Sequence, residues 1–211
     1  MPCECNKRGR IKNIIIESDK TVKKIFEKEQ DYYTEMCFYE EFKGFPYIPK
    51  LLKTSDSLEL HLEYIDGRSL YDCNYNEQLC LAETLGQFHK ETYNHDTGDC
   101  LIHFDTNLSN YIYKSQRVYM IDFSEIIISS PLSDVYSVLL FFAETLEPET
   151  FFVFQDEFLK IYYSNLGVVL TQSATILKDE INRFETRRES HNKCINNYHW
   201  FLQNKRIMEN I

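Results

Sequence analysis

The chain changes character at the bend Asp66-Gly67-Arg68, because strand-like patterns precede it and helix-like patterns follow it. Before the bend, β-branched or alternating apolar runs predict strands at residues 11–26, 48–52 and 58–65. Beyond it, apolar residues recur at helical spacing. Helices are therefore expected at residues 77–92, 133–146, 149–164 and, as one or two helices, 171–211. This order predicts an α+β fold of two lobes, with a β-rich N-lobe at residues 1–65 and a mainly helical C-lobe at residues 66–211.

One helix is predicted inside the N-lobe, at residues 29–43, where apolar residues form a single face. The strand before it holds Lys23 and Lys24, which must point to opposite faces of the sheet, so that only one can face the cleft. We favour Lys24, with Glu35 of the helix as its partner. The alternative for a strand lysine is a solvated edge position. The other helix glutamates are expected to face solvent: Glu29, Glu40 and Glu41.

The residues best suited to chemistry lie in the C-lobe, at the ends of short apolar runs. The segment from His103 reads H-x-D-x4-N and supplies Asp105 and Asn110, and the apolar run 118–121 ends at Asp122. Two carboxylates and a carboxamide on turns are suited to hold a divalent metal beside a polyphosphate and to accept a proton from a hydroxyl. Asp and Asn also favour turns for purely local reasons, which is the alternative for either half alone. Ser133-Asp134 is expected to cap the next helix.

The charge balance argues against nucleic acid as a partner. The formal net charge is -10 and the pI about 5.1, so a broad basic face for a phosphate backbone is not expected. Docking on an anionic membrane is disfavoured for the same reason. Basic residues gather near residues 7–12 and 187–193, and both groups are predicted to be solvated surface.

The cysteines and the hydropathy pattern favour a cytoplasmic protein. The chain has 7 cysteines, an odd and scattered set without the paired C-x-x-C knuckles of a zinc site. No apolar run reaches the roughly 18 residues of a transmembrane helix, and no signal-peptide core is visible. Free thiols in a reducing compartment are the simplest expectation.

Several motifs occur in one order along residues 14–145. In chain order they are Val22-Lys23-Lys24-Ile25-Phe26, Ile48-Pro49-Lys50-Leu51-Leu52, Leu62-Glu63-Tyr64-Ile65-Asp66-Gly67-Arg68-Ser69-Leu70, Leu85-Gly86-Gln87-Phe88-His89, His103-Phe104-Asp105 with Asn110, Asp122-Phe123, and Asp134. This series resembles the protein-kinase-like phosphotransferases. It is most similar to the branch that holds aminoglycoside and choline kinases, lipopolysaccharide sugar kinases and the small atypical kinases of the KEOPS complex.

The resemblance implies a two-lobed kinase-like fold, ATP and Mg²⁺ as cofactors, and a role for each matched residue. Asp105 would be the catalytic aspartate and Asp134 a structural one. The remaining matches are Lys24 as the lysine that holds the α- and β-phosphates, Glu35 as its helix partner, Glu63, Tyr64 and Ile65 as the backbone segment that binds adenine, and Asn110 and Asp122 as the metal ligands. His103 would support the loop rather than act as a base.

Three departures from the family pattern concern nucleotide binding and regulation. No G-x-G-x-x-G precedes Lys24, where Gly9 is the only glycine, so backbone amides over the phosphates would be fewer. Ser124 stands where the family has the glycine of D-F-G. Phe104 follows His103 where protein kinases have arginine, which removes the partner of a phosphorylated activation loop. A constitutively arranged site is therefore expected.

The sequence constrains the identity of the phosphate acceptor less than it constrains the site residues. We expect a kinase for a hydroxyl of a small molecule or glycan, such as a lipopolysaccharide-type sugar. About 65 residues follow the Asp134 helix, too few for the full polypeptide-docking helices of protein kinases. The first alternative is a small atypical protein kinase or an ATPase subunit that works with a protein partner. The second is a pseudokinase scaffold, suggested by the missing glycine loop.

Overall fold

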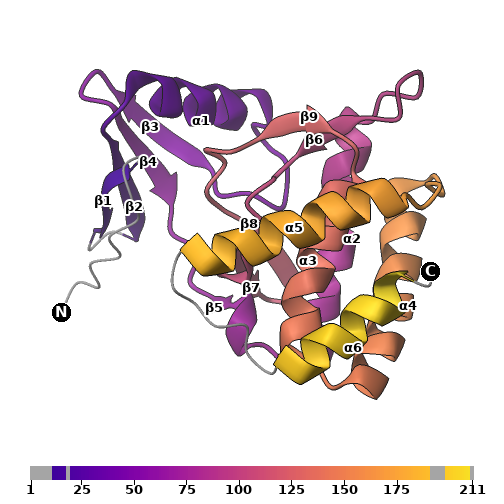
Figure 1. The fold of residues 1–211 in the computed structure, drawn as a ribbon. Helices are drawn as coiled ribbons and strands as arrows, with labels where there is room; N and C mark the ends of the chain where they lie inside the picture. The colour runs from indigo at the N-terminus through magenta and orange to yellow at the C-terminus, as the bar shows by residue number, and fades with distance from the viewer. Residues whose placement is uncertain (1–10, 18–19, 191–197, 210–211) are drawn as a thin grey trace.

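The first lobe is a four-stranded antiparallel sheet covered by one helix (Figure 1). The computed structural model describes residues 11–17, 20–190 and 198–209. The sheet has the order β1-β2-β4-β3. Its elements are β1 (Ile11–Ile16), β2 (Thr21–Phe26), β3 (Leu51–Ser55), β4 (Glu59–Glu63) and the covering helix α1 (Glu29–Glu41). The strands predicted within residues 11–26 and 58–65 and the helix predicted from residue 29 are confirmed.

Short strands and two 3-10 turns follow the bend and carry the loops of the candidate site. One small sheet has the order β5-β7-β8, and β6 pairs with β9. These elements are β5 (Arg68–Ser69), η1 (Leu70–Asp72), β6 (Cys100–Ile102), η2 (Leu108–Asn110), β7 (Tyr111–Lys114), β8 (Arg117–Met120) and β9 (Ile127–Ser129). A Cβ atom at Gly67 would lie 2.5 Å from the Tyr113 carbonyl oxygen, so the bend needs glycine in order to pass this close to β7.

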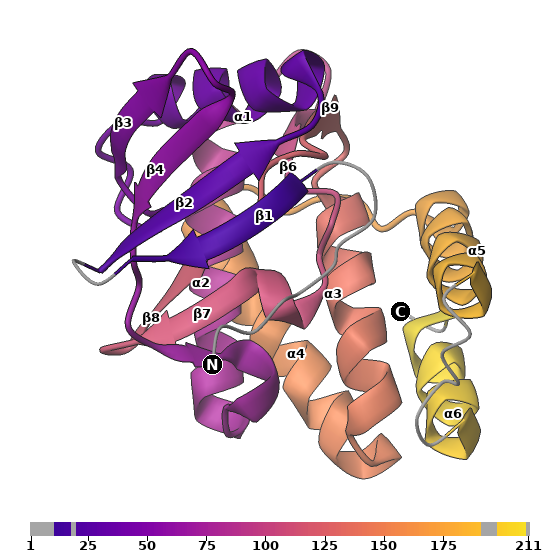
Figure 2. The same ribbon diagram turned by 90° about the vertical axis from the view of Figure 1, so that its left-hand side faces the viewer.

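Helices make up most of the second lobe (Figures 1 and 2). They are α2 (Tyr75–Thr92), α3 (Leu132–Thr145), α4 (Pro148–Leu166), α5 (Ala174–Ser190) and α6 (Tyr198–Glu209). The first three pack around a core rich in phenylalanine, with Phe88, Phe142 and Phe154 fully buried. In both views α5 and α6 lie on the outer side of α3, and both contact it.

Two local predictions differ from the structure. The strand expected at residues 48–52 runs from Leu51 to Ser55 and so begins two residues after Pro49. Proline lacks the N–H that a paired strand donates, and this favours a strand that begins beyond it. The capping role of Ser133-Asp134 is wrong, because α3 begins at Leu132 after Pro131 and both residues lie inside its first turn.

The division of the chain at residues 65 and 66 stays a prediction. Among the described residues, no helix is long and apolar enough to cross a membrane.

Candidate active site

A buried lysine of β2 joins the two lobes through carboxylates of α1 and the C-lobe. Lys24 Nζ lies 2.6 Å from Glu35 Oε1 and 3.3 Å from Asp122 Oδ1. Lys24 and Glu35 are both buried. Burial alone would lower the pKa of Lys24, but the charges of Glu35 and Asp122 outweigh burial and raise that pKa. The lysine therefore stays protonated at the bottom of the site.

The position of Glu35 is fixed by aromatic packing between α1 and the residue after Asp122. Phe38 stacks on Phe123 with ring centroids 3.9 Å apart, and Phe123 is fully buried. Phe38 lies one turn beyond Glu35, so the same helix face contacts Phe123 and points the carboxylate at Lys24. Lys23 points to the other face of the sheet and approaches Glu59 instead, as expected for neighbours in a strand.

The Asp105 loop is anchored by hydrogen bonds to Asp134, which is fully buried in the first turn of α3. The backbone N–H of His103 donates to Asp134 Oδ2 at 2.7 Å, and that of Phe104 donates to Oδ1 at 2.9 Å. His89 Nε2 lies 3.2 Å from Oδ2. Burial by itself would raise the pKa of Asp134, but the hydrogen bond and charge of His89 and the bond from His103 lower it overall. A buried carboxylate thus fixes the backbone immediately before Asp105.

His103 ties this loop to the strand that leads to Asp122. It is buried, and its Nε2–H donates to the Ile121 carbonyl at 3.0 Å. Phe104 has a φ of 64° and Asp122 a φ of 70°, a left-handed conformation that non-glycine residues seldom adopt. Such backbone strain persists where the surrounding contacts enforce it, and here it lies on both sides of the candidate site.

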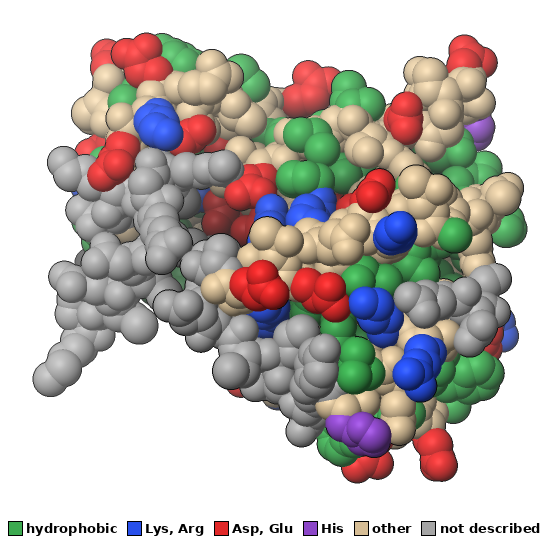
Figure 3. Space-filling view, in the orientation of Figure 1, with side chains coloured by type: hydrophobic (Ala, Val, Ile, Leu, Met, Phe, Trp, Pro, Cys, Tyr) green, Lys and Arg blue, Asp and Glu red, His purple; other side chains and the backbone are tan. Residues whose placement is uncertain are grey.

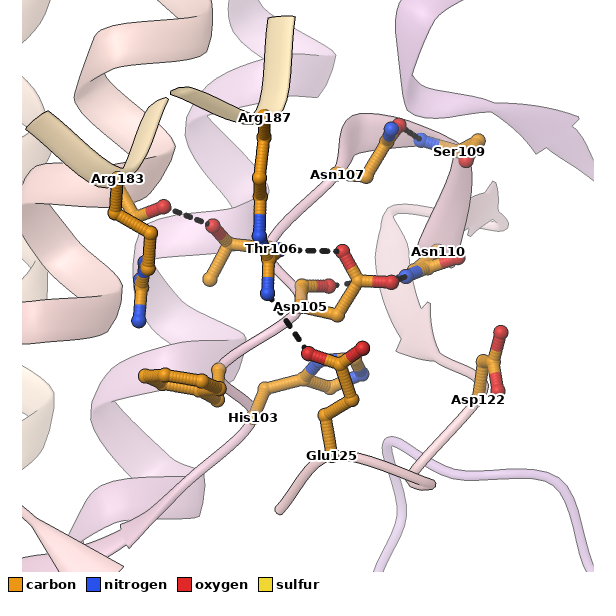
Figure 4. A network of polar contacts seen from close by, with 12 residues as sticks. His103, Asp105, Thr106, Asn107, Ser109, Asn110, Asp122, Glu125, Arg183 and Arg187 are labelled. Atoms are coloured by element: carbon orange, nitrogen blue, oxygen red, sulfur yellow. Dashed lines mark hydrogen bonds and ion pairs between the residues drawn. The ribbon is translucent and has the colours of Figure 1, made fainter. Parts of the chain in front are cut away.

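Asp105, Asn110 and Asp122 lie along one side of the loop (Figure 4). Asn110 Nδ2 donates to the Asp105 carbonyl at 2.9 Å and to Asp105 Oδ2 at 3.0 Å. These two bonds fix the orientation of the amide. Ser124, at the position where the family has glycine, donates its hydroxyl to Asp122 Oδ1 at 3.3 Å. The serine therefore helps to orient the carboxylate.

The donor set fits a magnesium ion that is completed by substrate. With Nδ2 of Asn110 bonded to Asp105, the amide oxygen is directed away from Asp105. An amide oxygen and a carboxylate are the oxygen ligands that Mg²⁺ accepts, and Mg²⁺ in nucleotide sites is commonly held by one or two protein groups together with phosphates and water. Among the described residues, no group of three or more His, Cys, Asp or Glu side chains could hold a metal by itself.

The segment Glu63-Tyr64-Ile65 leads from the end of β4 to the bend. It is the segment that the family resemblance assigns to the adenine contact. The Glu63 amide donates to the Lys50 carbonyl at 2.9 Å, and the Tyr64 amide donates to the Lys20 carbonyl at 2.9 Å. Ile65 is buried, and its carbonyl accepts from Gly67. The first two amides are thus used within the protein.

Three residues at this site were not identified from the sequence: Glu125, Arg183 and Arg187. Arg187 Nη1 lies 3.3 Å from Asp105 Oδ1, and its Nη2 lies 2.8 Å from Glu125 Oε2. The Arg183 guanidinium lies over the Phe104 ring, 3.9 Å from its centroid. The four-residue spacing of the two arginines signals a shared helix face, but it does not say what that face contacts.

The prediction that basic residues at 187–193 are solvated surface is wrong for the part that the structure describes. Arg187 contacts Asp105, and Arg188 is mostly buried beside Glu144. The reason is that α5 packs on α3, and Arg187 reaches from α5 to the Asp105 loop. The rest of the two basic groups, which is residues 7–10, the side chain of Lys12 and residues 191–193, lies outside the part of the chain that the structure describes, as does Gly9.

No protein-family model matches this sequence, and no curated protein does. Solved structures are similar in fold. Choline kinase LicA from Streptococcus pneumoniae superposes with a TM-score of 0.60 at 15% identity, over 94% of this chain and 89% of that one. A streptomycin-ATP-APH(2")-IIa ternary complex superposes with a TM-score of 0.59 at 14% identity, over 89% of this chain and 83% of that one. Amicoumacin kinase hAmiN, in complex with AMP-PNP, Ca²⁺ and Ami, superposes with a TM-score of 0.58 at 14% identity, over 92% of this chain and 89% of that one.

These identities are low, so the likeness concerns the fold. The two-lobed fold that the sequence motifs implied is confirmed, because the chain shares the fold of these solved kinases and phosphotransferases.

Proposed function

We propose that this protein is an ATP- and Mg²⁺-dependent kinase that transfers the γ-phosphate to a hydroxyl of a small molecule or glycan. The observation that carries the proposal is the convergence of Lys24, Glu35 and Asp122 at 2.6 to 3.3 Å, with Asp105 and Asn110 bonded to one another in the adjoining loop. Phosphoryl transfer needs such a lysine, carboxylates and carboxamide, because positioning and charge stabilisation supply most of its catalysis.

Each residue then has a chemical task. Asp105 receives the proton of the acceptor hydroxyl, whose oxygen forms the new bond to the γ-phosphorus while the bond to the leaving oxygen of ADP breaks. Lys24, held by Glu35, contacts the phosphates. Asn110 and Asp122 would hold Mg²⁺, which when bound neutralises charge on the phosphates. A backbone amide contact to adenine falls to Ile65, because the Glu63 and Tyr64 amides already donate within the protein.

A small acceptor is supported by the surface next to Asp105. Helix α5 contacts the Asp105 loop through Arg187, and a helix in this position narrows the space that an extended polypeptide would need. Solved structures of the same fold include a choline kinase and an aminoglycoside phosphotransferase bound to streptomycin. We therefore place small-molecule or glycan phosphorylation, including that of a lipopolysaccharide-type sugar, ahead of a protein kinase or ATPase subunit with a protein partner. A cytoplasmic location would supply the ATP.

The proposal is tested by Asp105→Asn, with ADP formation from ATP and Mg²⁺ measured across a panel of hydroxyl compounds. Loss of a positioned general base lowers a rate by about 10²- to 10⁴-fold, and a loss of this size is expected. Asp96→Asn, the same chemical change in an exposed loop, is the matched control and should keep the wild-type rate. Unchanged ADP formation in Asp105→Asn would contradict the catalytic role.

The pseudokinase alternative is tested by nucleotide binding. A kinase should show a rise in melting temperature with millimolar ATP and Mg²⁺, and Lys24→Met should reduce that rise. The absence of any shift in the wild-type protein would favour a scaffold.

A further inference from the structure

Helix α5 brings two arginines to the Asp105 loop from a distant part of the chain. Arg183 and Arg187 are four residues apart, so they lie on one face of the helix. Figure 3 shows basic side chains along the upper edge of α5, next to acidic ones. Arg187 bridges the carboxylates of Asp105 and Glu125, which belong to separate loops.

Asp105 divides its two carboxylate oxygens between opposite neighbours. Oδ2 accepts from Asn110 at 3.0 Å, and Oδ1 lies 3.3 Å from Arg187 Nη1. Figure 4 shows Asn110 and Arg187 on opposite sides of the Asp105 carboxylate. If Asn110 faces the metal and the phosphates, as proposed, the flank that remains for the acceptor is the one that holds Arg187.

Arg183 lies beside this flank and is held in place by two contacts. Its guanidinium stacks on Phe104 at 3.9 Å from the ring centroid, and it is paired with Glu180 in the same helix. Its side chain is largely buried, whereas that of Arg187 is 39% exposed. Arg187 is therefore the member of the pair that a ligand can reach.

We infer that Arg187 recognises an anionic group on the acceptor, and that the acceptor is a hydroxyl compound bearing a carboxylate or a phosphate. This inference rests on the proposed kinase function. A guanidinium presents two parallel N–H donors that match carboxylate and phosphate oxygens. Nη2 lies 2.8 Å from Glu125 Oε2 while Nη1 contacts Asp105, so the Nη2 arm of the guanidinium already binds a carboxylate. The Arg187–Glu125 pair is partly exposed, so exchange of Glu125 for a ligand anion costs little.

The same geometry disfavours a cationic acceptor. Choline carries a quaternary ammonium, a group that proteins bind with aromatic faces and carboxylates rather than guanidinium groups. An ammonium group beside Asp105 in this protein would meet Arg187. The arrangement thus predicts a different acceptor class from that of the choline kinase with the same fold.

The test compares matched hexoses that differ in charge. Glucuronate, glucose 6-phosphate, glucose and glucosamine are titrated into the protein with ADP and Mg²⁺, and binding is followed by ligand-observed NMR. We expect glucuronate or glucose 6-phosphate to bind about tenfold more tightly than glucosamine. Arg187→Gln should abolish this preference, and Arg187→Lys should retain part of it. Lys178→Gln, which removes one positive charge at an exposed position of the same helix, should leave it intact. Equal binding of all the sugars, or a preference that survives Arg187→Gln, would overturn the inference.

A second readout separates this inference from a structural role of Arg187 and from the kinase proposal. If Arg187 only positioned Asp105, Arg187→Gln would slow ADP formation equally with every acceptor and would leave the anion preference unchanged, and the inference would fail. If Arg187→Gln abolishes the preference while Asp105→Asn leaves ATP turnover unchanged, the anion site stands and the kinase role fails.

Discussion

Lys24 shows at the scale of single residues how a buried charge is kept in place. Two oxygens of Glu35 lie 2.6 and 2.7 Å from its Nζ, and Asp122 lies at 3.3 Å. Two charges in a nonpolar interior are costly unless they are paired, and removal of one partner leaves the other uncompensated. Glu35 and Asp122 also repel one another, and this repulsion is relieved only while the lysine lies between them.

A double-mutant cycle tests this arrangement. Lys24→Met and Glu35→Leu should each lower the free energy of unfolding by about 3–5 kcal/mol, the usual cost of an orphaned buried charge. Lys24→Met should cost more, because it leaves two carboxylates facing one another, whereas Lys24 retains Asp122 in Glu35→Leu. The double variant should be more stable than the sum of the single losses predicts, by about 0.5–3 kcal/mol.

Urea unfolding of the four proteins measures this coupling. Additive losses would mean that the pair contributes nothing as a pair. The control is Lys23→Met, on the opposite face of the same strand.

At the scale of elements, α2 and α4 pack closely because α2 has a glycine at the contact. A Cβ atom at Gly86 would lie 2.7 Å from the Tyr162 carbonyl and 2.7 Å from Asn165 Cβ. The carbonyl belongs to the backbone of α4 and cannot rotate away. This contact also places Tyr162, whose hydroxyl lies 2.8 Å from His89 Nδ1, next to the residues that hold the Asp105 loop.

Gly86→Ala should therefore destabilise the protein although alanine favours helices. The propensity gain is about 1 kcal/mol, and overpacking costs about 1–3 kcal/mol. We expect a net loss of about 0–2 kcal/mol, with reduced activity if α4 shifts and carries Tyr162 away from His89. Thermal and urea unfolding provide the measurement. Glu91→Ala, at an exposed position of the same helix, should change stability by less than about 0.5 kcal/mol, and a stabilised Gly86→Ala protein would refute the close contact.

At the scale of the whole molecule, the candidate active site takes residues from both lobes, and α5 contacts it through Arg187. Helix α5 docks on α3, and Arg188 pairs with Glu144 in that contact. Glu180 of α5 is buried near Arg183 and Asp134, and burial raises its pKa from 4.5 to about 7. The attraction of Arg183 opposes this effect without cancelling it.

The raised pKa of Glu180 links the stability of the folded protein to pH. Between about 4.5 and 7 the folded state binds more protons at this site than the unfolded state, so the contribution of Glu180 to the free energy of unfolding falls as pH rises through this window. It is fully present below pH 4.5 and lost above pH 7. Glu180→Gln should therefore become more stable relative to wild type as pH rises from 5 to 8. Urea unfolding at several pH values checks this, and a difference that does not change with pH would contradict the assigned pKa.

The sequence was sufficient for much of this description. Strand and helix types follow from local periodicity, which is why β1, β2, α1, α2 and α4 lie close to their predicted ranges. The candidate residues Lys24, Glu35, Asp105, Asn110 and Asp122 were identified by their order and spacing, and the structure brings them together. Their catalytic and metal-binding roles remain predictions.

The role of Asp134 was only partly readable from the sequence. An aspartate near the start of a predicted helix suggests a cap. The structure instead directs its carboxylate to the amides of His103 and Phe104. Local sequence cannot distinguish a helix cap from a loop anchor, because in both the aspartate lies at a helix N-terminus and accepts hydrogen bonds from backbone amides. Which amides donate depends on the loop that packs against the helix.

By itself the sequence determined the types of local element, the order of the site residues and the resemblance to kinase-like folds, because these depend on spacing within short segments. Only the tertiary structure decided that α5 lies beside Asp105 and that Arg187 reaches its carboxylate across 82 residues of chain. The apolar face of an amphipathic helix specifies that it must be buried, but not against which surface. That choice depends on the shape and charge of distant segments, and it placed a cation where the sequence alone suggested solvated surface.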